Sequence, residues 1–333
     1  MKLDIEQTKP WQQWELHHAV TPKSLIILFI LFIAFSFSAH NTELDKAAVE
    51  TSKAVLSIVG IGDSQVLDGA LRFTSKAFPM QISERTAISR LDDFDRNALP
   101  LFSYLEMGEE REYDALTEIW TIEKSEYLVE PLGYLWKVTV KMWETIEMGF
   151  WGTVICIMIS LPLSVLASRN YTPHRFVYSF VRGWLSLHRA MPELIVALIL
   201  VLMYGFGPIA GVLALAIHTS GVLGKFFADE IENAPPGPQL ALKSSGASAF
   251  KVLRYAVFPH VYPAWIAYVQ YIFERNIRTA TILGIVGAGG IGMELKGRWD
   301  VFDYSHVATI LLGIFITVVL LEYFSQKLRK HAL

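Results

Sequence analysis

Long apolar stretches separated by short polar segments are the dominant pattern of this chain. Five stretches of 16 or more residues contain no Asp, Glu, Lys or Arg, and they cover residues 24–39, 148–168, 194–224, 257–273 and 304–321. A helix needs about 20 largely apolar residues to cross the hydrocarbon core of a bilayer. The pattern therefore predicts an all-α integral membrane protein.

The third stretch is too long for one helix. Gly205, Gly207 and Pro208 interrupt it, and these residue types end or kink helices. We expect two spans there, over 190–205 and 209–227, joined by a tight turn. The total then rises to six transmembrane helices.

Basic residues in the short loops set the expected orientation, because short cytoplasmic loops carry an excess of Lys and Arg. They fall on one side of the predicted membrane: Lys23, Arg169, His174, Arg175, Lys243, Lys251, Arg254, Lys327, Arg329 and Lys330. We therefore expect a cytoplasmic tail and membrane anchor over 1–40, a periplasmic segment over 41–145, a transmembrane domain over 146–326 and a cytoplasmic tail over 327–333.

The predicted periplasmic segment is acidic. It holds 19 Asp and Glu against 11 Lys and Arg, a net charge of −8, whereas the whole chain carries −3. We expect an amphipathic helix near 47–58, a turn-rich middle, and a part over 113–142 that is rich in helix formers and aromatic residues.

Two metal-binding interpretations are excluded on pattern. The Asp93, Asp95 and Asn97 spacing resembles a calcium loop, but Ala98 replaces the required glycine and Tyr104 the bidentate glutamate. A solvated acidic turn is expected instead. His17 and His18 are adjacent in the tail and lack the spacing of a metal site.

The first apolar stretch is interpreted as a retained anchor. Its upstream region is 23 residues long and its apolar run exceeds a usual signal core, while Phe37 and Ala39 form a poor cleavage site. Cleavage is the alternative. The single cysteine, Cys156, lies inside a predicted span and allows no intramolecular disulfide.

A polar, amphipathic helix is predicted between the last spans, over 239–263. Apolar residues recur at helical spacing there, and Lys243, Lys251 and Arg254 make the segment cationic. Gly246 stands in the middle, where glycine costs roughly 1 kcal/mol relative to alanine. It indicates either close approach to a partner or a turn between two short helices.

Gly287, Gly289 and Gly292 match the GxGxxG pattern of dinucleotide sites. A further span follows them, however, which leaves no βαβ unit for a cofactor. We expect these glycines to form a re-entrant or irregular turn at the outer side, where protein groups satisfy the backbone.

Several strings in the last 190 residues resemble the permease subunit of phosphonate importers of the ABC superfamily. They are ETIEMGFWGT, SLPLSVLASRNYTPH, RAMPELIVALI, GVLALAIHTSGVLGKFFADEIEN, KSSGASAFKVLRYAVFPHVYP, NIRTATILGIVGAGGIG and FDYSHVATILL. The resemblance implies a type I importer permease bundle, a multi-pass protein of the bacterial inner membrane. It also implies a homodimer working with two cytoplasmic ATPase subunits and a periplasmic solute-binding protein.

The same resemblance places the ATPase-coupling loop at 231–259. The candidate coupling residues are Ser244, Ser245, Gly246, Ala247, Lys251 and Arg254. The chain departs from the family pattern at Leu240, which stands where an acidic residue is expected, and in its long periplasmic segment. No GxxxxGK[ST] motif occurs, so ATP and Mg²⁺ are expected on the partner ATPase, with no cofactor on this chain.

Polar residues at membrane depth are the candidates for the translocation pathway, because they are costly there unless paired or hydrated. They are His218, Thr219, Ser220, Asn276 and Arg278. The span that starts at Val257 is expected to continue towards Leu283, with its polar groups facing the interior. For His218 the alternative is a neutral imidazole bonded to a neighbouring helix. Glu193 is expected to pair with Arg189 at the membrane interface.

The predicted function is a permease that imports phosphonate, or a related phosphorus oxyanion, by alternating access. The alternatives are an importer permease for another small solute and, more distantly, a stand-alone secondary transporter, for which the inverted repeat is missing. No catalytic residues, metal ligands or nucleic-acid-binding features are recognisable, so the chain is not expected to be an enzyme.

Overall fold

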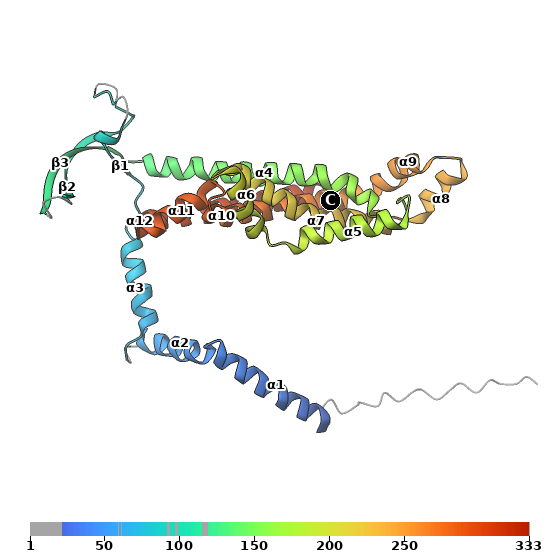
Figure 1. The fold of residues 1–333 in the computed structure, drawn as a ribbon, viewed down its shortest axis with the longest axis horizontal. Helices are drawn as coiled ribbons and strands as arrows, with labels where there is room; N and C mark the ends of the chain where they lie inside the picture. The colour runs from blue at the N-terminus through green and yellow to red at the C-terminus, as the bar shows by residue number, and fades with distance from the viewer. Residues whose placement is uncertain are drawn as a thin grey trace, which may run out of the picture. The chain divides into compact units, whose positions relative to one another are not determined.

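A computed structural model describes residues 22–332, apart from 59, 61, 92, 93, 97, 98 and 115–118. The excluded metal-binding interpretations therefore rest partly on residues outside the described ones, namely His17, His18, Asp93, Asn97 and Ala98. The chain forms two compact units, residues 1–74 and 75–333, which are described separately (Figure 1).

The smaller unit consists of helices. Helix α1 (Pro22–Asn41) is apolar along its whole length and is one of the candidate membrane spans. Helix α2 (Leu44–Ile58) confirms the amphipathic helix predicted near 47–58. Most of α3 (Gln65–Ala77) also belongs to this unit.

The larger unit is a helical bundle with a small sheet. Its long helices are α4 (Gly133–Leu166), α5 (Arg175–Ala190), α6 (Glu193–Tyr204), α7 (Pro208–Asn233), α10 (Phe258–Ile285), α11 (Gly290–Asp300) and α12 (Tyr304–Ala332). Shorter elements join α7 to α10: α8 (Pro236–Ser244), α9 (Ala249–Val252) and the π-helical turn η2 (Leu253–Val257).

Helices occupy all six positions where the sequence predicts spans. Within the described residues, α1, α4, α7 and α12 are long and apolar enough to cross a membrane, and the pair α5 and α6, bent by 86°, has the length and composition of a broken span or a re-entrant loop. The span predicted over 190–205 is thus the short helix α6. The amphipathic helix α5 before it was not predicted.

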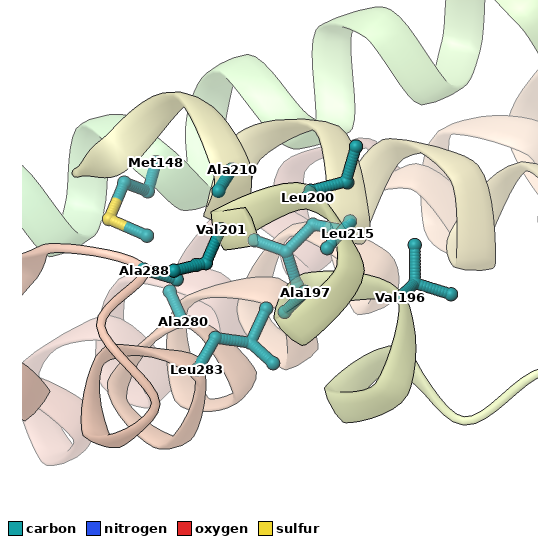
Figure 2. Close-up of a cluster of buried hydrophobic side chains, with 11 residues drawn as sticks. Met148, Val196, Ala197, Leu200, Val201, Ala210, Leu215, Ala280, Leu283 and Ala288 are labelled. Carbon is teal, nitrogen blue, oxygen red and sulfur yellow. The ribbon is translucent and has the colours of Figure 1, made fainter. Parts of the chain in front are cut away.

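The bundle core lies where α4, α6, α7 and α10 meet. Its largest cluster of buried side chains consists of Met148, Val196, Ala197, Leu200, Val201, Ala210, Ala214, Leu215, Ala280, Leu283 and Ala288. In Figure 2, Ala197 and Val201 of α6 lie close to Leu215 of α7. Gly152 brings α4 against α7, since a Cβ there would lie 3.0 Å from the Leu215 Cβ.

The prediction of a segment rich in helix formers over 113–142 is wrong for its first part, which forms strands. Strands β1 (Glu84–Ala87), β2 (Tyr104–Asp114) and β3 (Ile119–Glu130) form an antiparallel sheet in the order β1-β3-β2. The β-branched and aromatic residues of β3 favour a strand despite its glutamates and lysine. The chain is therefore mostly, but not wholly, helical.

The sheet is tied to the ends of α4 and α12. The Leu135 amide donates to the Ile82 carbonyl at 3.2 Å, and the Thr309 hydroxyl donates to the Gln81 carbonyl at 2.6 Å. We call this the sheet end of the bundle. Helices α8 and α9 lie at the opposite end (Figure 1), beside the last turn of α4 and the first residues of α10.

The glycine-rich segment forms an irregular turn between α10 and α11, as predicted. Gly289 and Gly290 have φ of +86° and +68°, which non-glycine residues rarely adopt. The Gly290 amide donates to the Glu144 carboxylate at 3.0 Å, and the Ile291 amide donates to the Thr145 hydroxyl at 2.9 Å. Protein groups therefore satisfy the backbone, and no nucleotide-binding βαβ unit follows.

Candidate coupling lobe and membrane polar cluster

Helices α8 and α9 and the turn η2 form a lobe, residues 236–257, whose shape depends on the turn at Gly246. Gly246 has φ of +81°, and the space where its Cβ would project is empty. The Ala247 amide donates to the Leu242 carbonyl at 3.0 Å and closes the end of α8. Gly246 therefore provides a left-handed turn between two short helices, the second of the two alternatives that the sequence left open.

The candidate coupling residues gather on this lobe. Ser244 and Ser245 end α8 and donate hydrogen bonds to the carbonyls of Ala241 and Leu242, at 2.9 and 2.8 Å. Lys251 lies on α9 and is exposed. Arg254 follows in η2, where its guanidinium lies 5.6 Å from the Tyr255 ring centre.

The lobe also exposes large apolar side chains. Leu240, Phe250 and Tyr255 are 63%, 67% and 64% exposed, respectively. Lys243, Lys251 and Arg254 are exposed on the same lobe, and exposed apolar residues together with polar ones are typical of a protein interface. The position expected to be acidic, Leu240, thus lies on this exposed surface.

Gln239, next to Leu240, fixes the lobe to the bundle. Its side chain is buried and donates to the carbonyls of Ala234 and Pro235 at 3.0 and 3.2 Å. The Tyr171 hydroxyl donates to its Oε1 at 2.8 Å, and burial raises the pKa of the Tyr171 phenol. Gln239 therefore closes the α7–α8 junction with a neutral hydrogen-bond network.

A second polar group lies inside the bundle and joins α6, α7 and α10. We call His218, Glu193 and Arg275 the polar cluster. The His218 Nδ1 lies 2.8 Å from the Met191 carbonyl oxygen and donates to it. Its Nε2 lies 3.1 Å from both the Glu193 Oε2 and the Arg275 Nη2, and Arg275 also lies 3.3 Å from Glu193 Oε1.

This geometry gives the imidazole two alternative bonds at one nitrogen. A neutral ring accepts a hydrogen bond from Arg275, whereas a protonated ring donates to Glu193. His218 is buried, while the side chains of Glu193 and Arg275 are 26% and 28% exposed. The cluster therefore holds a partly accessible guanidinium inside the bundle.

The other candidate pathway residues lie elsewhere. Thr219 and Ser220 are buried and donate to carbonyls of their own helix α7. The Asn276 amide donates to the Thr153 hydroxyl at 2.9 Å, and Arg278 pairs with Glu274 at 2.6 Å on one face of α10. The structure thus brings only His218 of the five candidates into the polar cluster.

Sequence reasoning missed Arg275, and it assigned Glu193 to a pair with Arg189 that the structure replaces with His218 and Arg275. The available signal was the charged string Glu274–Arg278 within an otherwise apolar helix. Which of its two arginines faces α6 depends on the rotation of α10, and that rotation is set by packing.

Comparison with known proteins identifies the family. Residues 140–330 match the family described as binding-protein-dependent transport system inner membrane component. HtxE of Stutzerimonas stutzeri, which is assigned to a phosphite transport system as a permease protein, is 48% identical over 256 residues, covering 76% of this chain and 98% of that protein. The chain belongs to this family.

A second sequence relative and a solved structure are also similar to this chain. The phosphite transport system permease protein PtxC of the same organism is 43% identical, over 56% of this chain and 68% of its own length. The MetNI methionine ABC transporter, solved in inward facing conformations, matches 60% of this chain and 97% of the solved chain with a TM-score of 0.53 and 19% identity. The chain is thus a multi-pass inner-membrane permease with the fold of type I ABC importers.

Proposed function

We propose that this chain is the membrane subunit of an ATP-driven importer that moves phosphite, phosphonate or a related phosphorus oxyanion into the cytoplasm by alternating access. The family and the names of the relatives support this cargo class. The observation that carries the proposal is the coupling lobe, whose exposed Leu240, Phe250 and Tyr255 are not covered by the bundle.

The partner of the lobe is a cytoplasmic ATPase dimer, which binds ATP and Mg²⁺. Hydrolysis has to be supplied by another protein, because this sequence lacks a P-loop. The left-handed turn at Gly246 sets the angle between α8 and α9, and the buried Gln239 fixes the lobe to the end of α7. Movement of the ATPase would then reach α7 and α10 directly, since the lobe connects these two helices.

The second partner is another copy of this chain, and the third is a periplasmic solute-binding protein. Two copies present two lobes to the two ATPase subunits. The acidic segment over 41–145, which ends in the sheet and the start of α4, is proposed to contact the binding protein rather than the cargo, because its −8 charge repels an oxyanion.

The polar cluster is proposed to act on the anionic cargo. Arg275 is a partly exposed cation on α10, and in this structure its charge is neutralised by Glu193 at 3.3 Å. A passing oxyanion can replace that carboxylate as the partner of the guanidinium. The His218 Nε2 lies 3.1 Å from both Glu193 and Arg275, so a change in the pairing of these two residues reaches α7.

The coupling proposal is tested by changing Phe250 to Asp. The side chain is 67% exposed, so the bundle should assemble normally while an apolar interface gains a desolvated charge. Co-purification of the ATPase should fall by roughly tenfold or more, and binding-protein-stimulated hydrolysis should be lost. Leu101→Asp is the matched control, because Leu101 is 85% exposed and lies in the predicted periplasmic segment.

Normal ATPase capture by the Phe250 variant would contradict the coupling assignment. The cargo is tested separately, by uptake of radiolabelled phosphite into cells that express the permease with its ATPase and binding protein. Unlabelled phosphonate, phosphate and methionine serve as competitors. Absence of phosphite uptake together with uptake of labelled methionine would replace the oxyanion with another small solute and leave the permease assignment intact.

A further inference from the structure

A polar pocket lies where α4 turns into α5. It has a volume of about 440 Å³ and is lined by Arg169, Thr172, Arg175, Tyr178 and Ser179. We call it the elbow pocket. The Thr172 hydroxyl donates to the Leu166 carbonyl and the Arg169 Nε donates to the Tyr178 hydroxyl at 3.2 Å. The two guanidinium groups keep further N–H donors, so the pocket suits an anion with several acceptor oxygens.

Among the described residues, neither guanidinium that lines the elbow pocket forms an ion pair with a carboxylate, and the nearby acidic residues are occupied elsewhere. Arg182, about two turns after the start of α5, pairs with Asp229 at 2.8 Å and Glu232 at 3.2 Å. Glu232 also accepts a hydrogen bond from the Arg169 amide at 2.8 Å. Among the described residues, the structure gives Arg175 no acidic partner.

The position of Arg175 makes the lack of a neighbouring negative charge more costly. It is the first residue of α5, where the helix dipole disfavours a cation, and the first turn of α5 contains no acidic residue. An anion in the elbow pocket would lie against both Arg175 and the positive end of the helix. The pocket is therefore complementary to a phosphate group in charge and in donors.

An aromatic ladder runs along α5 directly from this pocket. Phe176, Phe180 and Trp184 are 72%, 61% and 45% exposed, and successive rings stack with centres 6.4 Å apart. The opposite face of α5 buries Val181 and Leu185 against α7. The helix thus has one packed face, one polar face at the pocket and one exposed aromatic face.

The polar and aromatic faces are adjacent on α5. Ser179 of the pocket and Phe176 and Phe180 of the ladder lie within one helical turn, so a ligand can contact all three. A free oxyanion would account for the pocket but not the ladder, and an apolar protein surface would account for the ladder but not Arg175. A phosphate joined to long hydrocarbon chains fits both.

We propose that the α4–α5 elbow binds an anionic phospholipid, with its headgroup in the elbow pocket and its acyl chains along the aromatic ladder. Basic loops place this elbow on the predicted cytoplasmic side, where anionic lipids attract Lys and Arg near the surface. Because α5 packs on α7, the bound lipid would brace the helix that leads into the coupling lobe. This site is independent of the cargo and of the ATPase.

The test compares lipids retained by the purified full-length protein in native mass spectrometry, after exchange into equal amounts of dioleoylphosphatidylglycerol and dioleoylphosphatidylcholine. The Arg169→Gln/Arg175→Gln variant should lower the ratio of bound phosphatidylglycerol to phosphatidylcholine by roughly tenfold. The Phe180→Ser/Trp184→Ser variant should lower retention of both lipids. Lys251→Gln/Arg254→Gln, which removes two cations from the same predicted side, should leave the ratio unchanged.

Wild-type protein provides a readout that does not depend on how the variants fold. It should prefer phosphatidylglycerol, and millimolar inorganic phosphate should not displace the lipid, because phosphate lacks the acyl contacts. Displacement by phosphate would identify a free-anion site and overturn the proposal. An unchanged lipid ratio in the double arginine variant would overturn it as well, as would loss of the dimer, with lipid retained, in the aromatic variant.

Discussion

The two ends of the bundle are built in opposite ways. At the sheet end, charged side chains from α4, α11, α12 and β1 neutralise one another over short distances. At the lobe end, α8 and α9 bury Gln239 and Val252 and leave Leu240 and Phe250 exposed. The comparison shows that one end is held by its own contacts, whereas the other leaves large apolar side chains uncovered.

Ion pairs at the sheet end meet at Arg298. Its Nε lies 3.1 Å from Glu294 and its Nη1 3.1 Å from Asp303. Its guanidinium also lies 4.9 Å from the ring centre of Tyr134, a fully buried residue. The network extends to the sheet through Lys137, which contacts both Glu294 and Glu84.

Removing the centre of this network should have the largest effect on stability. Arg298→Gln leaves Glu294 and Asp303 partly buried without their shared cation, and we expect a loss of roughly 2–3 kcal/mol in the free energy of unfolding. The measurement is the thermal unfolding midpoint in detergent micelles. Lys296→Gln is the control, because its pair with Asp300 on the same helix is exposed and should contribute little.

The same network gives a pH dependence with a defined sign. Burial tends to raise the pKa of Asp303, but the hydrogen bond with His306 and the charge of Arg298 outweigh it and hold that pKa below its usual value. A carboxyl with a depressed pKa stabilises the fold above its unfolded pKa and loses this contribution as pH falls through the folded pKa. The Arg298 variant should therefore lose its sheet-end contacts at a higher pH than wild type.

The polar cluster lies between the two ends, so its loss should leave both intact. Arg275→Gln should lower uptake by roughly tenfold, because the partly buried cation is removed from the bundle interior, while ATPase capture and thermal stability stay near wild type. Arg278→Gln is the matched control, since Arg278 is 44% exposed and pairs with Glu274 on its own helix. A greater loss of uptake in the Arg278 variant would reverse the assignment.

The sequence predicted the positions of the long helices well, because apolar length is a one-dimensional signal. It also predicted the irregular turn at Gly287–Gly292, since several closely spaced glycines are incompatible with a regular helix. The amphipathic helix α5 was missed because Arg175, Arg182 and Arg189 interrupt it and make it look like a loop.

Features that depend on the rotation of one helix against another could not be predicted. Arg275 and Arg278 stand three residues apart on α10, yet one meets His218 across the bundle and the other pairs locally. Arg298 likewise meets partners from separate parts of the chain: Tyr134 of α4, Glu294 of α11 and Asp303 before α12. The sheet was missed because β3 mixes residues that favour strands with glutamates that favour helices.

A smaller effect is expected at the lobe. Gly246→Val forces a β-branched residue into φ of +81° and should cost roughly 1–3 kcal/mol locally. Because the site is exposed, the lobe should distort while the bundle keeps its unfolding temperature, and ATPase capture should fall several-fold. Gly237→Val is the control, since its Cβ also meets open space without a positive φ. Equal ATPase capture by the two variants would show that coupling does not depend on the left-handed turn at Gly246.

The smallest effect is expected at the tip of the sheet, beyond the ionic network. Glu109 pairs with Lys124 in the β2–β3 ladder, so residues 110–123 can be replaced by Asn-Gly, which favours a tight two-residue turn. The sheet end keeps its ties through β1 and Lys137, and stability should not change. If the hairpin contacts the binding protein, half-maximal stimulation of hydrolysis should need about two- to fivefold more loaded binding protein, with basal hydrolysis unchanged. An unchanged dependence on binding-protein concentration would show that the distal hairpin is dispensable for capture, and would confine that role to the base of the sheet.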